Sequence, residues 1–179
     1  MKLLRFALAT LGLLGATPML AQNLDYGRPG MFAQLNGVAS FESFDGAPAG
    51  LFDTGIGASG RVGFRISPQF AVEGMVEYSG DFVDASGIDL SATLLAANAR
   101  YYMLPGRVQP YVTTGIGWAF ASTNLFSDES GFVSRFGGGL DFYIAESWGL
   151  SGEFAYNLAT GDLEGLDYMT LGWGVFLRF

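Results

Sequence analysis

The chain has 179 residues, of which half are apolar, 27 are glycine and only 15% are charged, a composition that fits one domain rather than two. It contains no cysteine and no histidine. The first absence excludes a disulfide framework, a thiolate metal site and a cysteine nucleophile, and the second removes the commonest general base and transition-metal ligand.

Residues 1–21 have the pattern of a cleaved signal peptide. Lys2 and Arg5 provide a basic start, an apolar run follows over residues 6–15, and small and apolar residues complete the segment. A spanning helix needs about 20 apolar residues without the small-residue and proline break found here. We therefore expect export followed by removal of this segment.

The mature chain is strongly acidic. Without residues 1–21 it has seven arginines, no lysine and seventeen aspartates and glutamates, a net charge of −10. Such a surface repels nucleic acid, so we expect no nucleic-acid partner.

We interpret residues 22–30 as a short N-terminal periplasmic segment and residues 31–179 as a β-barrel domain.

Beyond residue 30, apolar and polar residues alternate with period two in eight runs separated by turn-rich segments. This pattern predicts an all-β fold, an eight-stranded antiparallel transmembrane barrel with up-and-down meander topology. The predicted strands cover 31–42, 55–67, 70–79, 91–103, 110–121, 132–143, 149–158 and 168–179.

The connections alternate between short and long. The short ones are 67–69, 104–107 and 145–147, and the long ones are 43–54, 80–90, 122–131 and 159–167. Short turns at one end and long loops at the other are typical of a membrane barrel with its turns in the periplasm and its loops outside.

One face of each predicted strand is apolar. In the strand 55–67, Val62, Phe64 and Ile66 alternate with Arg61 and Arg65. The lumen of an eight-stranded barrel is just wide enough to be filled by its own side chains, so the bulky apolar faces belong outside.

The strand 91–103 departs from this pattern. Leu94 lies in the same phase as Asn98 and Arg100, which face inward by the same reasoning. We expect a bulge or a different start in the upper half of this strand.

The inward positions carry a balanced set of charges. The set is Arg61, Arg65, Arg100, Arg135 and Arg178 with Glu42, Glu73, Glu77, Asp141 and Glu153. An enclosed charge costs several kcal/mol unless it is paired, so this balance predicts a sealed polar lumen. A hairpin centred on the turn after Ser67 predicts the pairs Arg61–Glu77 and Arg65–Glu73.

Glycines occupy inward positions on three strands. They are Gly115, Gly117, Gly137, Gly139, Gly172 and Gly174. We expect them to leave room for long arginines from the opposite wall.

The long loops are acidic and hold no basic residue. Their acids are Asp45, Asp53, Asp81, Asp84, Asp89, Asp128, Glu129, Asp162, Glu164 and Asp167. Clusters such as 162–167 could hold Ca²⁺ or Mg²⁺. We favour instead a solvated loop of mutually repelling charges, and we assign no metal site.

The last predicted strand ends on an aromatic residue, with apolar residues at alternate positions before it. These residues are Leu171, Trp173, Val175, Leu177 and Phe179. The pattern resembles the C-terminal assembly signal of bacterial outer-membrane proteins. The resemblance implies that the β-barrel assembly machinery reads these five residues.

The signal peptide, the strand rhythm and the runs Pro110-Tyr111-Val112 and Gly139-Leu140-Asp141-Phe142 support a wider resemblance. Residues from about 30 to 179 resemble the small outer-membrane β-barrel superfamily, the porin family that includes the OmpA transmembrane domain, OmpX and the opacity proteins. The resemblance implies a Gram-negative outer-membrane location and contact with membrane lipid and lipopolysaccharide.

Three functions are compatible with this fold. Our first hypothesis is a non-enzymatic barrel with a plugged polar lumen and acidic surface loops, contributing to envelope integrity or surface interaction with an unidentified extracellular ligand. The second is a narrow porin-like conduit for small solutes or ions. The third is an enzyme acting on lipid A or peptides, which we do not favour because the chain lacks histidine. We assign no catalytic residue and no cofactor.

Overall fold

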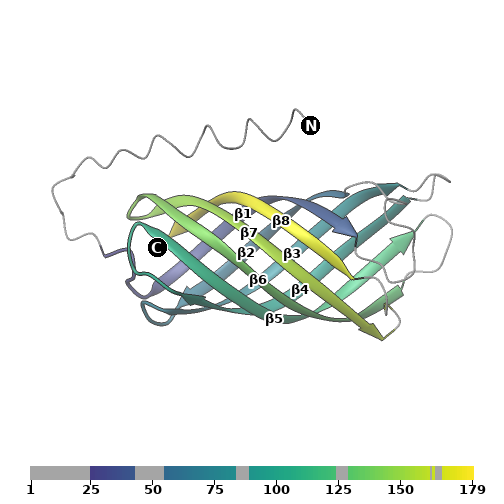
Figure 1. Cartoon of the computed structure of the whole chain (residues 1–179), viewed down its shortest axis with the longest axis horizontal. Helices are drawn as coiled ribbons and strands as arrows, with labels where there is room; N and C mark the ends of the chain where they lie inside the picture. The colour runs from purple at the N-terminus through teal and green to yellow at the C-terminus, as the bar shows by residue number, and fades with distance from the viewer. Residues whose placement is uncertain (1–24, 43–54, 84–88, 124–128, 162, 164–166) are drawn as a thin grey trace, which may run out of the picture.

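The computed structural model describes residues 25–42, 55–83, 89–123, 129–161, 163 and 167–179 (Figure 1). The predicted signal peptide lies outside these residues. Among the described residues, no helix is long and apolar enough to cross a membrane.

The chain forms a closed antiparallel barrel in which each strand pairs with its neighbours in sequence and β1 pairs with β8. The strands are β1 (Gly30–Glu42), β2 (Gly55–Arg65), β3 (Phe70–Val83), β4 (Asp89–Tyr102), β5 (Val108–Thr123), β6 (Glu129–Ala145), β7 (Trp148–Gly161) and β8 (Tyr168–Arg178). The predicted eight-stranded, all-β up-and-down barrel is confirmed. The turns β2–β3, β4–β5 and β6–β7 lie at one end, the short-turn end, and the strand ends that the longer connections join lie at the other, the loop end (Figure 1).

The strands turn their apolar faces outward, as predicted. In β2, Val62 and Phe64 are 58% and 47% exposed, whereas Arg61 and Arg65 are buried. Successive side chains in a strand point to opposite faces, so a closed barrel places every second residue in its lumen. The exterior is therefore apolar and the charged residues lie inside.

The predicted β2–β3 register is wrong by two residues. Arg61 lies opposite Met75 and Arg65 lies opposite Ala71, not opposite Glu77 and Glu73. The reason is the turn: the backbone N–H groups of Ile66 and Ser67 both donate to the carbonyl of Phe70, which centres the hairpin on Pro68. A two-residue shift preserves the facing of both strands and changes only the partners.

The irregularity expected in the strand 91–103 lies in its neighbour. The β3–β4 register shifts between Ser79 and Phe82 on β3, while β4 stays in phase. Leu94 is therefore an inward residue, only 1% exposed. Strand β3 runs to Val83 and β4 begins at Asp89, so pairing continues through much of the predicted loop 80–90.

Inside the loop-end half of the barrel is an apolar layer. It consists of Met75, Leu94, Ala119, Ala121, Val133, Ala159 and Leu163. Leu163 belongs to the β7–β8 connection and is 3% exposed, so that connection inserts an apolar side chain into the mouth of the barrel. The lumen is not polar throughout, in contrast to the sequence prediction.

Candidate functional site

The centre of the lumen contains a carboxylate bound by several arginines. Glu153 on β7 accepts two hydrogen bonds from Arg61, both at 2.7 Å, and one from Arg135 at 2.9 Å. The hydroxyl of Tyr111 donates to the same carboxylate at 2.9 Å. These donors come from β2, β6 and β5, so Glu153 links strands around the barrel.

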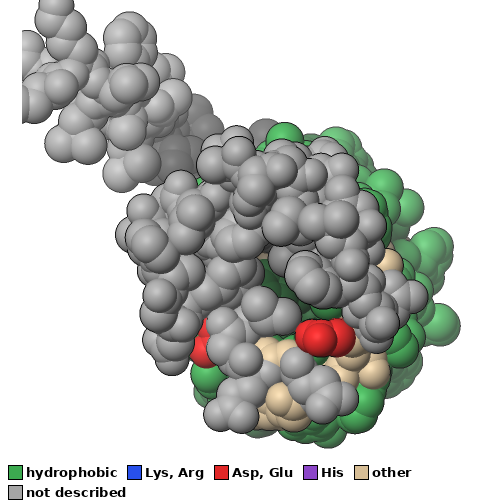
Figure 2. Space-filling model, turned by 90° about the vertical axis from the view of Figure 1, so that its right-hand side faces the viewer, with side chains coloured by type: hydrophobic (Ala, Val, Ile, Leu, Met, Phe, Trp, Pro, Cys, Tyr) green, Lys and Arg blue, Asp and Glu red, His purple; other side chains and the backbone are tan. Residues whose placement is uncertain are grey.

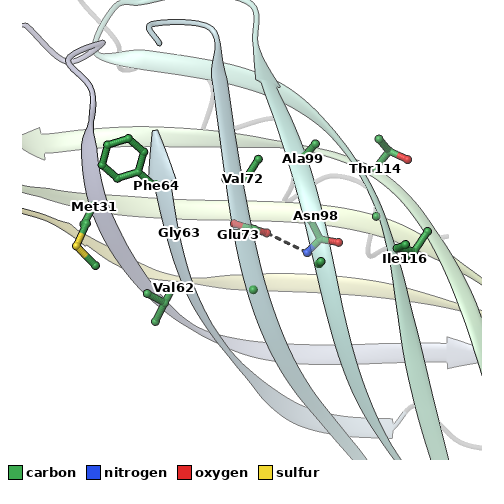
Figure 3. A pocket seen from close by; sticks show the side chains of 13 residues that line it. Met31, Val62, Gly63, Phe64, Val72, Glu73, Asn98, Ala99, Thr114 and Ile116 are labelled. Atoms are coloured by element: carbon green, nitrogen blue, oxygen red, sulfur yellow. Dashed lines mark hydrogen bonds between the residues drawn. The ribbon is translucent and has the colours of Figure 1, made fainter. Parts of the chain in front are cut away.

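Two further carboxylates extend this network towards the short-turn end. Glu73 lies 2.9 Å from Nε of Arg100 and accepts a hydrogen bond from Asn98 at 3.1 Å, drawn in Figure 3. Asp141 accepts hydrogen bonds from Ser151 at 2.6 Å and from the hydroxyl of Tyr102 at 3.2 Å. The side chains of Glu73 and Arg100 are at most 1% exposed, so the charges are compensated by protein groups.

Glu77 is the least satisfied of the inward acids. Its nearest cation is Arg135, 3.6 Å away, and neither of its oxygens has a hydrogen-bond partner in the described part of the chain. Arg135 itself bonds Asn157 at 2.8 Å as well as Glu153. Glu77 therefore contributes charge to the network with little directional bonding.

At the short-turn end, Arg65 and Arg178 bind backbone carbonyls. Both guanidinium groups donate to the carbonyl of Tyr26, Arg65 at 3.2 Å and Arg178 at 2.6 Å. Arg178 also donates to the carbonyl of Arg28, and Arg65 to that of Pro68. The residues 25–29 that precede β1 thus lie across this end of the lumen.

The structure brings nine of the ten predicted lumen charges into the barrel interior. The side chain of the tenth, Glu42, lies outside the described residues, although its backbone pairs with Tyr168 in β8. Neither predicted pair, Arg61–Glu77 nor Arg65–Glu73, forms. Across the described residues, Arg61, Arg100 and Arg135 make ion pairs with carboxylates.

Several network residues carry no charge and were therefore not part of the predicted set of lumen charges. They are Tyr26, Gln34, Asn98, Tyr102, Gln109, Tyr111, Tyr143 and Asn157. Tyr102 and Tyr111 share the inward phase of Arg100 and Thr113 in their strands, which is a signal that could have found them.

The inward glycines do not simply make room for arginines. A Cβ atom at Gly139 would lie 2.5 Å from the ring of Tyr111, and one at Gly115 would lie 1.9 Å from Asn98 Oδ1. The space over these two glycines is filled by side chains of neighbouring strands. At Gly172, by contrast, the nearest atom would be 3.8 Å away.

The outer surface is a continuous apolar belt. The five residues of the predicted assembly signal all belong to it, with exposures from 44% for Leu171 to 73% for Phe179. Small residues on neighbouring strands, among them Gly74, Ala97 and Ala99, form a shallow outer groove flanked by Phe64 and Ile116 (Figure 3). A barrel with charges inside and bulky apolar residues outside is the arrangement of a membrane protein.

The family model described as outer membrane protein beta-barrel domain matches residues 6–179, nearly the whole chain. The chain belongs to this family. The predicted relation to the small outer-membrane barrels is thereby confirmed.

Solved outer-membrane barrels have the same fold. Neisserial surface protein A is 18% identical with a TM-score of 0.72, the match covering 85% of this chain and 99% of that one. The N-terminal β-barrel domain of Pseudomonas aeruginosa OprF is 15% identical with a TM-score of 0.58, covering 85% and 100%. Ail of Yersinia pestis is 16% identical with a TM-score of 0.57, covering 84% and 97%. No curated protein sequence matches the chain.

Family membership places the protein in the outer membrane of a Gram-negative cell. The apolar belt is then the surface that contacts lipid, and from the usual orientation of such barrels we expect the short-turn end to face the periplasm and the loop end to face outward. Among the coloured atoms at the loop end, acidic and no basic side chains are visible (Figure 2).

The acidic residues at the loop end are only partly described. Asp81, Asp89 and Glu129 lie in strands rather than loops. Asp167 accepts hydrogen bonds from the backbone of Ala159 at 2.9 Å and from the hydroxyl of Tyr156 at 3.0 Å, so it fastens the β7–β8 connection. The other predicted loop acids, Asp45, Asp53, Asp84, Asp128, Asp162 and Glu164, lie outside the described residues. Where the chain is described, no three acidic residues are grouped to hold a metal ion.

Proposed function

We propose that the protein is a non-enzymatic outer-membrane barrel with a plugged lumen, which contributes to envelope integrity or to contacts at the cell surface. The observation that carries this proposal is the filling of the lumen at three levels. Along the barrel axis, the apolar layer lies towards the loop end, the network around Glu153 lies in the middle, and Tyr26 lies at the short-turn end.

The central network is a strong barrier to ions. A hydrated ion passing the centre must separate Arg61 from Glu153, which are joined by two short charge-assisted hydrogen bonds. Breaking such a buried pair costs several kcal/mol because both charges lose their partners. The apolar layer around Leu94 adds a region that offers an ion no ligands.

We therefore expect the refolded barrel to be electrically silent in a planar bilayer. Folding is verified first by heat-modifiable migration on a gel. As a positive control, the double variant Arg61→Ala, Glu153→Ala removes the tightest pair together, and we expect it to conduct more readily than the wild type. Discrete, reproducible openings of the wild-type barrel would overturn the plugged-lumen proposal.

A narrow conduit is the alternative function, and one feature favours it. The inner face at Gly172 is the most open of the inward glycine positions considered above. If the wild type conducts and Gly172→Leu abolishes the current while the chain still folds, this alternative replaces our proposal.

The lumen also explains why we propose no catalytic activity. Glu73, Asp141 and Glu153 are buried and engaged with arginine, tyrosine or serine partners, so they are not available as bases to a substrate.

We expect the negative charge of the loops to determine which kind of extracellular partner the barrel binds. Ail of Yersinia pestis has been solved in complex with the heparin analogue sucrose octasulfate, a polyanion. In this chain the segments 43–54 and 159–167 contain acids and no base, so they repel sulfated glycans. The loops favour a cationic partner.

We further propose that residues 1–21 are removed on export and that the C-terminal strand is read by the β-barrel assembly machinery. We expect Phe179→Ala to lower the amount of heat-modifiable barrel in the outer membrane several-fold. Phe70→Ala is the matched control, because Phe70 is also an exposed aromatic at the short-turn end but lies in β3. Equal losses in both variants would contradict an assembly role for Phe179.

A further inference from the structure

Three side-chain donors converge on one oxygen atom at the periplasmic end of the lumen. The carbonyl oxygen of Tyr26 accepts hydrogen bonds from Arg65 at 3.2 Å, from Gln109 Nε2 at 3.2 Å and from Arg178 at 2.6 Å. The donors come from β2, β5 and β8, so the barrel itself holds them in place. We call Arg65, Gln109 and Arg178 the arginine cradle.

The cradle carries two positive charges, and neither forms an ion pair within the described part of the chain. Arg65 and Arg178 are 2% and 6% exposed, and among the described residues neither lies within ion-pair distance of a carboxylate. Their other hydrogen bonds go to neutral groups. Arg65 donates to Gln109 Oε1 at 2.6 Å and to the carbonyls of Ser67 and Pro68, and Arg178 donates to the carbonyl of Arg28 and to the Tyr143 hydroxyl at 3.1 Å. The ring of Tyr102 lies 4.0 Å from the Arg65 guanidinium. A buried cation whose hydrogen-bond partners are all neutral favours an anion over a carbonyl dipole.

The segment that supplies the carbonyl is held by few other contacts. Residues 25–29 belong to no strand, and the side chains of Asp25, Arg28 and Pro29 are exposed. Apart from the cradle, the main contact is between the rings of Tyr26 and Tyr143, whose centroids are 5.0 Å apart. The cost of displacing the segment is therefore mostly the loss of the cradle bonds themselves.

We propose that the arginine cradle is an oxyanion-binding site which the Tyr26 carbonyl fills as an internal ligand, and that a periplasmic phosphate or carboxylate competes for it. Two guanidinium forks and an amide N–H match the several acceptor oxygens of such a group, whereas the segment presents single carbonyl oxygens. Binding of the anion displaces residues 25–29 from the mouth of the barrel. This site does not depend on whether the barrel conducts.

The test compares two refolded chains, one starting at residue 22 and one starting at Pro29. Each is titrated by calorimetry in detergent with inorganic phosphate and, separately, with acetate. We expect the shorter chain to bind one phosphate and the longer chain to bind it about tenfold more weakly or worse, because its own segment competes. Tighter binding of acetate than of phosphate would assign the site to carboxylates.

Two variants of the shorter chain decide whether the cradle is responsible. Arg178→Gln should abolish binding, whereas Arg107→Gln should leave it unchanged. Arg107 is a matched control because it is an exposed arginine at the same end of the barrel and lies outside the cradle. No binding to the folded shorter chain, or equal binding to the Arg178→Gln variant, would overturn the proposal.

A second measurement uses the longer chain, in case the shorter one does not fold. The protein has no cysteine, so Gly27→Cys introduces a unique thiol at a buried position of the segment. A Cβ atom there would lie 3.3 Å from Pro68 Cβ, a contact that a small movement relieves. We expect phosphate to accelerate maleimide labelling of this thiol and not that of Glu146→Cys, an exposed turn position. A labelling rate at Gly27→Cys that is independent of phosphate would contradict the competition.

Discussion

Replacing Glu153 by alanine is expected to lower the free energy of unfolding by about 3 to 5 kcal/mol. The carboxylate accepts hydrogen bonds from Arg61, Arg135 and Tyr111, and its side chain is only 2% exposed. Its removal leaves two arginines in the lumen without their strongest partner. The penalty comes mainly from these uncompensated charges rather than from the lost contact alone.

Equilibrium unfolding of the barrel in lipid vesicles measures this effect, with denaturant midpoints compared at equal slope. Glu146→Ala is the matched control, since Glu146 is an exposed glutamate in the β6–β7 turn and its loss should change stability little. The loss of unfolding free energy for Glu153→Gln should lie between those of Glu153→Ala and Glu146→Ala, because the amide keeps an acceptor for Tyr111 but not the negative charge. An unchanged midpoint for Glu153→Ala would mean that the central network does not stabilise the barrel.

The sequence was sufficient to predict which face of each strand lies in the lumen, because the same alternation of apolar and polar residues recurs from strand to strand. An eight-stranded barrel fills its own lumen, so a run such as Arg61-Val62-Gly63-Phe64-Arg65 has one stable orientation. The partners of each charge depend instead on register. Moving the centre of one turn by a single residue, to Pro68, replaced both predicted ion pairs while every side chain kept its face.

The counter-groups of Arg65 and Arg178 could not be predicted by counting charges. Their partners are backbone carbonyls of Tyr26 and Arg28, and every residue of any sequence carries a carbonyl. The predicted balance of five bases and five acids was therefore not the way the lumen is neutralised. The apolar layer was missed for a related reason: Leu94 was recognised as being in the inward phase, but a polar lumen was assumed to exclude it.

Replacing Ile116 by arginine is expected to lower the free energy of unfolding in lipid by about 2 to 4 kcal/mol. Ile116 lies at the middle of β5 and is 59% exposed on the apolar belt, so an arginine there places a charge in the hydrocarbon core of the membrane. Met103→Arg is the matched control, because Met103 is also an exposed apolar residue but lies beyond the end of β4, where the cost should be about 0 to 1 kcal/mol. The two losses of unfolding free energy distinguish two kinds of barrel. A soluble barrel would tolerate both arginines on its exposed surface, whereas a membrane barrel is destabilised more by the central one. Equal effects at the two positions would contradict the assignment of the belt to lipid, even with the fold intact.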